Sequence, residues 1–328
     1  MIVESEAHME QQYNDMYSKP KQRPGRGFFY LWGPLLIKYG IAYLVTIVFA
    51  YVMVRTQFMT NGAVSEEALE AAMSTEAGMN QIFNMILEES MPYLVILDGV
   101  AAALTIPVMI FMFHRDRVRE KIAGIVPNKK AELWKYSAII GISAALCVAL
   151  NCLIYLSGLL PMDATYQATM ELMYSAPFWV QIICLGILAP VCEELVFRGL
   201  IFKRFRAQTG FVRSALISTF VFAFIHGNMI QMLYAVIMGM IFAYVYEKYG
   251  SVKAPIVAHI AANMISLICT EFNSFEWMLE ETMRINLITI ACAAFAATMY
   301  VLIQRIEEKP EVEEKIDDNE MNEEPTAM

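Results

Sequence analysis

Residues 177–201 read PFWVQIICLGILAPVCEELVFRGLI, an apolar stretch that carries two adjacent glutamates and an arginine. A helix of about 20 residues, rising 1.5 Å per residue, crosses the ~30 Å hydrocarbon core of a bilayer. Apolar stretches of this length recur along the 328 residues, of which 58% are hydrophobic, and most charges lie between them. The pattern predicts an all-α, multi-pass integral protein of the cell membrane that contacts the lipid bilayer directly.

We predict a polytopic helical bundle of about eight transmembrane helices, near residues 33–54, 92–113, 136–157, 177–201, 211–227, 230–248, 253–270 and 285–305. Basic loops alternate with loops that are acidic or lack Lys and Arg. The loop 115–135, for example, contains seven Lys and Arg, and the loop 158–176 contains none. Because Lys and Arg are retained on the cytoplasmic side, both termini are predicted to be cytoplasmic.

The chain divides into five predicted parts. They are a polar cytoplasmic N-terminus (1–32), N-terminal membrane helices (33–176) with a long outer loop (55–91), a candidate catalytic core (177–270), a last membrane helix (271–306) and an acidic, disordered tail (307–328). An amphipathic helix is expected in the outer loop, around Glu66 to Leu87. The tail alone carries a charge of −8 out of a total of −9, so the rest is nearly neutral and no nucleic-acid partner is expected.

Ionisable side chains inside membrane helices are costly, which makes them candidates for a functional site. Glu194 and Arg198 are four residues apart, so they share a helix face and can pair. Glu193 lies about 100° further round the helix and can point elsewhere. Pro190 is expected to kink this helix or to open its backbone.

Later helices carry further polar residues. Phe222 and His226 are four residues apart, as are His259 and Asn263. Glu193 and His226 both lie 16 residues from the turn at 209–210, so an antiparallel hairpin brings them to one depth. We therefore expect these residues to converge in the cytoplasmic half of the membrane.

Two kinds of chemistry fit such a cluster. A carboxylate in a dry pocket is a good general base for water, an imidazole can pass the proton on, and an imidazole and an amide can stabilise an oxyanion. Alternatively, Glu193, His226 and His259 are ordinary ligands for Zn²⁺, although the zinc signature H-E-x-x-H is absent. Both hypotheses lead to amide hydrolysis inside the membrane.

Structural roles are the alternatives. Glu194 with Arg198 is equally well an orienting salt bridge, Phe222 a packing residue, His226 a hydrogen-bonded core histidine, and His259 with Asn263 a polar contact between helices. Two further charges occur in apolar stretches. Lys38 is expected to reach back to the cytoplasmic surface, and Asp98 to make a polar contact in the outer half of the membrane.

The three motifs resemble the CPBP family, the CAAX-protease and bacteriocin-processing intramembrane endopeptidases, which includes the type II CAAX prenyl endopeptidase and many bacterial Abi proteins. The family pattern is Glu-Glu-x-x-x-Arg, then Phe-x-x-x-His, then His-x-x-x-Asn. Here it reads Glu193-Glu194-Leu-Val-Phe-Arg198, Phe222-Ala-Phe-Ile-His226 and His259-Ile-Ala-Ala-Asn263. The likeness covers roughly residues 177–270.

The resemblance implies roles for these positions. Glu193 would activate water with help from His226, His259 and Asn263 would line the oxyanion hole, and Glu194 and Arg198 would hold the shape of the site. It implies a (metallo)endopeptidase acting near the cytoplasmic side on a membrane-associated peptide or protein, such as a prenylated or leader peptide. A non-proteolytic scaffold or bacteriocin-immunity protein, and a proton-coupled transporter, are the rival hypotheses.

Overall fold

The computed structural model describes residues 27–60, 73–125 and 130–306, and these residues form helices and no β-strand. Seven helical stretches among them are long and apolar enough to cross a membrane. They are Phe28–Thr56, Glu76–Ile122, Leu133–Leu156, Phe178–Arg206, Met229–Tyr249, Lys253–Glu271 and Thr282–Gln304. The all-α, multi-pass architecture is thus confirmed, and the eighth predicted helix, Phe211–Phe224, is present in a shorter form.

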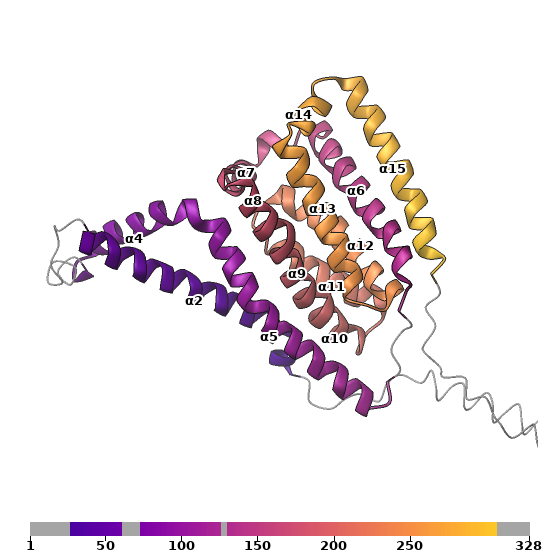
Figure 1. Cartoon of the computed structure of the whole chain (residues 1–328), viewed down its shortest axis with the longest axis horizontal. Helices are drawn as coiled ribbons and strands as arrows, with labels where there is room; N and C mark the ends of the chain where they lie inside the picture. Colours follow the sequence, from indigo (N-terminus) through magenta and orange to yellow (C-terminus); the bar gives the residue numbers. More distant parts are fainter. Residues whose placement is uncertain (1–26, 61–72, 126–129, 307–328) are drawn as a thin grey trace, which may run out of the picture.

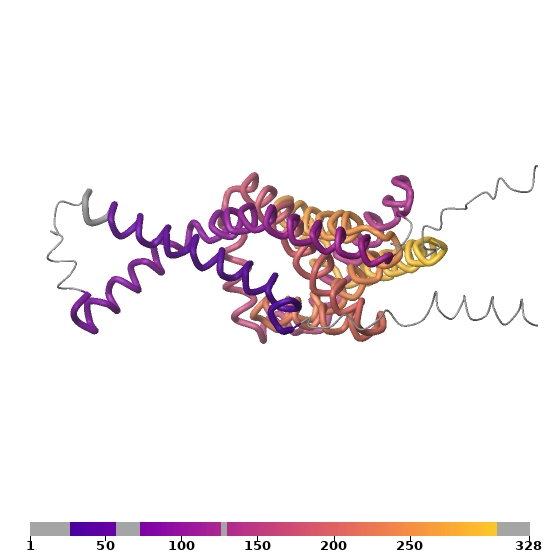
Figure 2. Tube along the Cα trace, turned by 90° about the horizontal axis from the view of Figure 1, so that it is seen from below, coloured from indigo at the N-terminus to yellow at the C-terminus, as the bar shows by residue number. Residues whose placement is uncertain are grey.

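An N-terminal group of helices packs against the long helix Phe178–Arg206 at one end and extends away from the rest of the protein at the other (Figures 1 and 2). It consists of α2 (Phe28–Thr60), α4 (Glu76–Ser90) and α5 (Leu94–Ile122). Helix α4 begins at Thr75, whose side chain accepts a hydrogen bond from the backbone N–H of Gly78, and it lies in the predicted outer loop. The part of the expected outer helix before residue 73, the N-terminal residues 1–26 and the acidic tail lie outside the described residues.

One long helix, from Phe178 to Arg206, contains the Glu-Glu-x-x-x-Arg motif and includes two π-helical segments. Its successive parts are α8 (Phe178–Gln181), the π-helix η4 (Ile182–Leu188), α9 (Ala189–Glu194), the π-helix η5 (Leu195–Phe202) and α10 (Lys203–Arg206). Short π-helical insertions are frequent at functional sites. The prediction that the backbone opens around Pro190 is confirmed by η4, which ends just before it.

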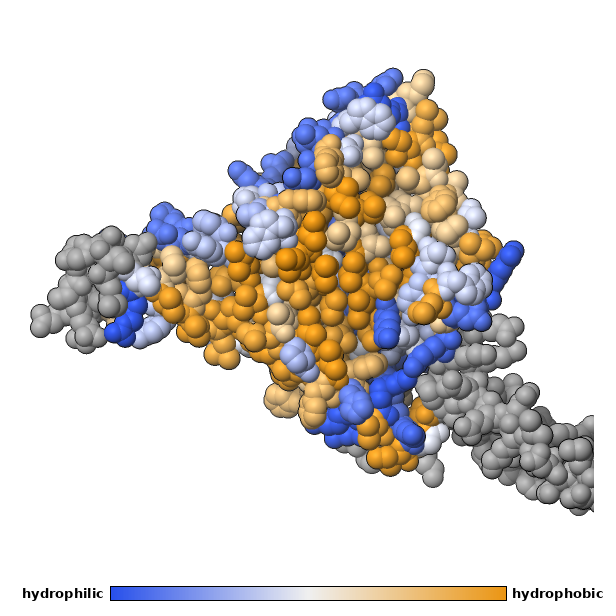
Figure 3. All heavy atoms as spheres, in the orientation of Figure 1, coloured by the Kyte–Doolittle hydropathy of each residue, from blue (hydrophilic) through white to orange (hydrophobic). Residues whose placement is uncertain are grey.

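The remaining helices complete the bundle. They are α6 (Tyr136–Leu156), α7 (Ala164–Ser175), α11 (Phe211–Phe224), α12 (Met229–Tyr249), α13 (Lys253–Glu271), α14 (Ser274–Leu279) and α15 (Thr282–Gln304). One buried apolar cluster joins α6, α12, α13 and α15, and a second joins α5, the long helix, α11 and α12. Apolar side chains cover the middle of the face seen in Figure 3, and polar ones gather around α14 and at the opposite end.

Two boundaries differ from prediction for physical reasons. The expected loop 158–176 contains helix α7, which begins where the Asp163 side chain accepts a hydrogen bond from the N–H of Tyr166. The expected helix 211–227 ends at Phe224, so His226 lies in the turn that precedes α12. With 14 residues, α11 is about 21 Å long and stops short of a ~30 Å hydrocarbon core.

Candidate active site

A buried ion pair lies at the centre of the site. Glu194 and Arg198 are both fully buried, and Arg198 Nη1 donates to Glu194 Oε1 over 2.9 Å. Arg198 Nη2 also donates to the backbone carbonyl of Gly239 on α12, over 3.1 Å. A Cβ at position 239 would lie 3.0 Å from Arg198 Nη2 and 2.9 Å from Thr219 Cγ2, so glycine lets the guanidinium reach this carbonyl.

Aromatic rings enclose the same guanidinium. Its central carbon lies 4.5 Å from the ring centre of Phe222 and 5.3 Å from that of Phe242. The imidazole of His259 stacks on Phe242 at 4.8 Å and meets Phe222 edge-on at 5.9 Å. Phe222 therefore packs in this structure, and it orients both the arginine and the histidine.

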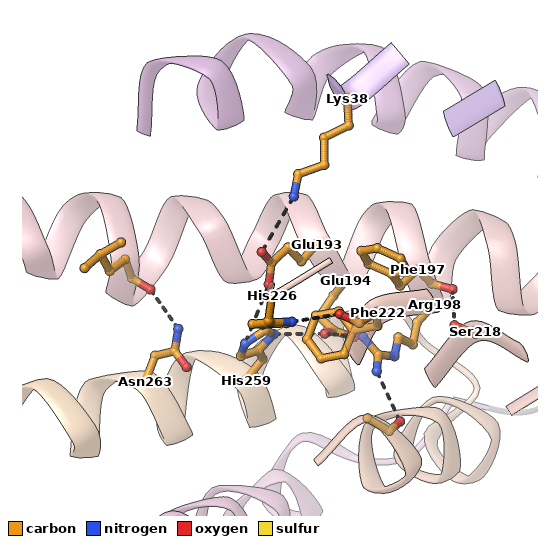
Figure 4. Close-up of polar contacts among 12 residues, drawn as sticks. Lys38, Glu193, Glu194, Phe197, Arg198, Ser218, Phe222, His226, His259 and Asn263 are labelled. Atoms are coloured by element: carbon orange, nitrogen blue, oxygen red, sulfur yellow. Dashed lines mark hydrogen bonds and ion pairs between the residues drawn. The ribbon is translucent and has the colours of Figure 1, made fainter. Parts of the chain in front are cut away.

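His259 connects the two glutamates. Its Nδ1 donates to Glu194 Oε1 over 2.9 Å, and its Nε2 lies 3.9 Å from Glu193 Oε2 (Figure 4). Because Nδ1 carries the hydrogen, a neutral ring turns its Nε2 lone pair towards Glu193, and a protonated ring turns an N–H there. The ring is therefore placed to share or move a proton at Glu193.

Glu193 points away from the buried pair, as the 100° step along the helix predicts. Its Oε1 lies 3.7 Å from Lys38 Nζ of α2, and its side chain is 17% exposed, whereas that of Glu194 is fully buried. Glu193 is thus the accessible carboxylate of the two. A group that has to receive water and a substrate needs this access.

His226 lies beside Glu193 and His259 in Figure 4, although it belongs to the turn after α11. Its Nδ1 contacts the carbonyl oxygen of Phe222 at 2.8 Å, and its ring packs edge-on against that of Phe222 at 4.9 Å. Since a carbonyl only accepts, Nδ1 carries the hydrogen and the Nε2 lone pair is left for chemistry.

Asn263 supplies a hydrogen bond that Pro190 cannot make. In the π-helical register the N–H of Ala189 bonds to the carbonyl of Cys184, five residues earlier. In the same register the N–H of residue 190 would bond to the carbonyl of Leu185. Residue 190 is a proline and has no N–H, so this carbonyl receives no helical hydrogen bond. Asn263 Nδ2 donates to the Leu185 carbonyl instead, over 2.9 Å.

A small cavity lies on the exposed side of Glu193. Its volume is about 10 Å³, close to the minimum that holds one water molecule. The polar residues that line it are Lys38, Asp98, Thr105, Cys192 and Glu193. The cavity therefore offers polar partners for one water next to the accessible carboxylate.

The structure brings together Glu193, Glu194, Arg198, Phe222, His226 and His259, whereas Asn263 bonds to Leu185, and the site gains two further residues. Lys38 was expected to reach the cytoplasmic surface, and this is wrong, because its ammonium pairs with Glu193. Asp98 lines the same cavity as Lys38 and Glu193. The sequence gives one sign of Lys38 and Asp98, because each is a lone charge in an apolar helix. It does not indicate which residue of another helix each one contacts.

The predicted zinc ligands do not fit a metal in this arrangement. Among residues 27–60, 73–125 and 130–306, no group of three or more His, Cys, Asp or Glu side chains is arranged to hold a metal ion. Three or four such ligands about 2 Å from one point are what zinc requires. Lys38 also places a positive charge at Glu193, which opposes a second cation there.

Comparisons with known proteins agree with the motifs. Residues 175–265 match the family described as "Type II CAAX prenyl endopeptidase Rce1-like". The chain is 31% identical over 102 residues to the protein named "Putative membrane peptidase YdiL" of Bacillus subtilis (strain 168). That match covers 31% of this chain and 41% of the relative, so the chain spans less than half the length of the curated relative it matches.

No solved structure matches the chain. The family match begins just before α8 and ends within α13, so it contains every motif residue from Glu193 to Asn263. Lys38 and Asp98 lie outside it. Residues 175–265 are therefore similar to the type II CAAX prenyl endopeptidase family, and the similarity is limited to this part of the chain.

Proposed function

We propose that the chain is an intramembrane endopeptidase in which Glu193 activates a water molecule for attack on a peptide bond. One observation carries the proposal. Glu193 is the accessible carboxylate of the site and borders a cavity the size of one water, His259 turns its Nε2 towards the same carboxylate, and His226 lies beside it. A base, a place for water and proton carriers are what amide hydrolysis needs.

In the proposed reaction, Glu193 takes a proton from water as the water oxygen bonds to the carbonyl carbon of the substrate. The carbonyl oxygen becomes an oxyanion, for which our candidate donors are the Nε2–H of His259 in its protonated form and the second N–H of the Asn263 amide. When the C–N bond breaks, the leaving nitrogen receives the proton that Glu193 took, directly or through the Nε2 of His226. The products are a carboxylic acid and an amine, and Glu193 is a carboxylate again.

The buried pair has a different role in this proposal. Neither Glu194 nor Arg198 lines the cavity, and both are fully buried among aromatic rings. They fix His259 through its Nδ1 and so fix the face that it turns to Glu193. They are positioning residues, as is Phe222.

As substrate we propose a membrane-associated peptide or protein, prenylated or carrying a leader, cut near the cytoplasmic side. The name of the matching family supports a prenylated substrate, and the name of the Bacillus relative supports a membrane peptidase in general. The large apolar area on the face seen in Figure 3 is suited to a substrate that arrives within the bilayer.

The test compares cells that contain the wild-type protein with cells that contain Glu193→Gln or His226→Ala. New peptide termini in membrane and secreted fractions are measured by mass spectrometry. Glu171→Gln and His114→Ala are matched controls, because both residues are exposed and outside the site. We expect termini that depend on Glu193 and His226 and are unaffected by the controls.

The same experiment distinguishes an endopeptidase from a non-proteolytic scaffold. If no terminus depends on Glu193 in correctly folded protein, the endopeptidase proposal is wrong. A scaffold or immunity protein would keep its cellular phenotype in Glu193→Gln and lose it in Arg198→Ala, which removes the buried guanidinium that holds the helices together.

A further inference from the structure

Lys38 is a charged residue in an apolar helix, and its side chain points towards the inside of the protein. Helix α2 is apolar, and no residue of its most apolar 18-residue stretch is buried inside the protein. A lysine in such a helix can usually extend to the membrane surface. Lys38 instead points inwards to Glu193, and its side chain is only 17% exposed (Figure 4).

The register of α2 is fixed at a point one or two turns before Lys38. Pro34 has no N–H, so the carbonyl of Tyr30 lacks its helical partner. Arg204 of the long helix donates to this carbonyl and, over 2.7 Å, to Asp116 of α5. This contact joins α2, α5 and the long helix, and it sets the position from which Lys38 reaches the site.

Both oxygens of Glu193 then have a partner on a different helix. Oε1 faces Lys38 of α2 at 3.7 Å, and Oε2 faces His259 of α13 at 3.9 Å. The two contacts act on different oxygens, so together they favour one orientation of the carboxylate. Lys38 also lines the cavity of about 10 Å³ that Glu193 borders.

We propose that Lys38 is a positioning residue that holds the Glu193 carboxylate in its working orientation beside the one-water cavity. The inference rests on the proposed endopeptidase function and deepens it. It assigns α2, which lies outside the region matched by the family, a part in the reaction. Small misplacements of a reacting group, of about 1 Å, cost up to about 100-fold in rate.

The experiment uses full-length protein in proteoliposomes. The probe is a synthetic peptide that spans the cleavage site with the strongest dependence on Glu193 in the cell experiment above. Lys38→Met keeps the length and apolar stem of the side chain and removes the charge, and Lys38→Arg keeps the charge. Lys121→Met, on the exposed last turn of α5, is the matched control.

We expect Lys38→Met to lower kcat by about 10- to 100-fold with KM within about threefold of wild type. Lys38→Arg should recover a large part of the loss, and Lys121→Met should behave as wild type. Thermal unfolding in detergent checks folding, and Lys38→Gln takes the place of Lys38→Met if the latter does not fold.

Each other outcome overturns the inference. A kcat for Lys38→Met equal to or above that of the control would show that the ammonium does not position Glu193. Equal losses in Lys38→Met and Lys38→Arg, or misfolding of both neutral variants, would show a purely structural contact. If no cleavage depends on Glu193 at all, the proposed function fails first and the inference fails with it.

Discussion

Replacement of Arg198 by alanine should cost the protein most of its stability. The guanidinium is fully buried, donates to Glu194 and to the carbonyl of Gly239, and lies against two phenylalanine rings. Removal of one partner of a buried ion pair costs about 3–5 kcal/mol, because the other charge stays buried without compensation. The lost hydrogen bonds and ring contacts are parts of this figure and are not added to it.

Arg206→Ala is the matched control. Arg206 pairs with Glu247 over 2.8 Å, but its side chain is 41% exposed, and exposed pairs contribute about 0–1 kcal/mol. Unfolding from mixed detergent micelles by titration with sodium dodecyl sulfate measures both variants. If the free energies of unfolding of Arg198→Ala and Arg206→Ala differ by less than about 1 kcal/mol, the argument from burial is refuted.

A double variant tests the cause. Arg198→Met alone leaves Glu194 charged and paired only with His259, whereas Glu194→Gln with Arg198→Met removes both charges and keeps an acceptor for His259 Nδ1. Because neutral replacement of a whole buried pair is often tolerated, the double variant should be more stable than Arg198→Met. A double variant that is less stable than the single one would contradict this reasoning.

Three further predictions concern other parts of the protein. Asn263→Ala should lower the free energy of unfolding by about 1–2 kcal/mol, because the Leu185 carbonyl loses its donor. This loss should be smaller in a Pro190→Ala background, where residue 190 gains an N–H that can donate to Leu185. A double-mutant cycle of unfolding free energies measures the difference. Hydrogen bonds from backbone N–H groups lower the pKa of Asp163. Its stabilising effect is therefore complete at neutral pH and is lost as the pH falls through that lowered pKa. The difference in Tm between wild type and Asp163→Asn should disappear in acid. Chelators should leave Glu193-dependent cleavage unchanged and the purified protein should contain less than one equivalent of zinc; loss of cleavage that zinc restores would revive the metal hypothesis.

Helices and motif residues were predictable because their signals are local. Apolar stretches of membrane length and four-residue spacings identify the transmembrane helices, the Glu194–Arg198 pair and the shared face of His259 and Asn263. The end of α11 was missed because the apolar stretch that forms the helix continues through Ile225, and Gly227 and Asn228, the residues that signal the turn, come only after His226. The role of Lys38 was missed because its partner Glu193 lies 155 positions along the chain, and a lysine near a helix end in an apolar stretch is typical of snorkelling.

The adjacency of Glu193 and Glu194 explains how a rigid centre and a reactive carboxylate can be coupled. The helical step of about 100° sends Glu194 into the core, where Arg198 and the aromatic rings immobilise it, and sends Glu193 to the cavity. His259 contacts both, through Nδ1 and Nε2 respectively, so its position at the reactive carboxylate is set by the buried pair. A change at Glu194 should therefore reduce cleavage even though Glu194 does not border the cavity, and Glu194→Gln, which keeps an acceptor for Nδ1, should reduce it less than Glu194→Ala.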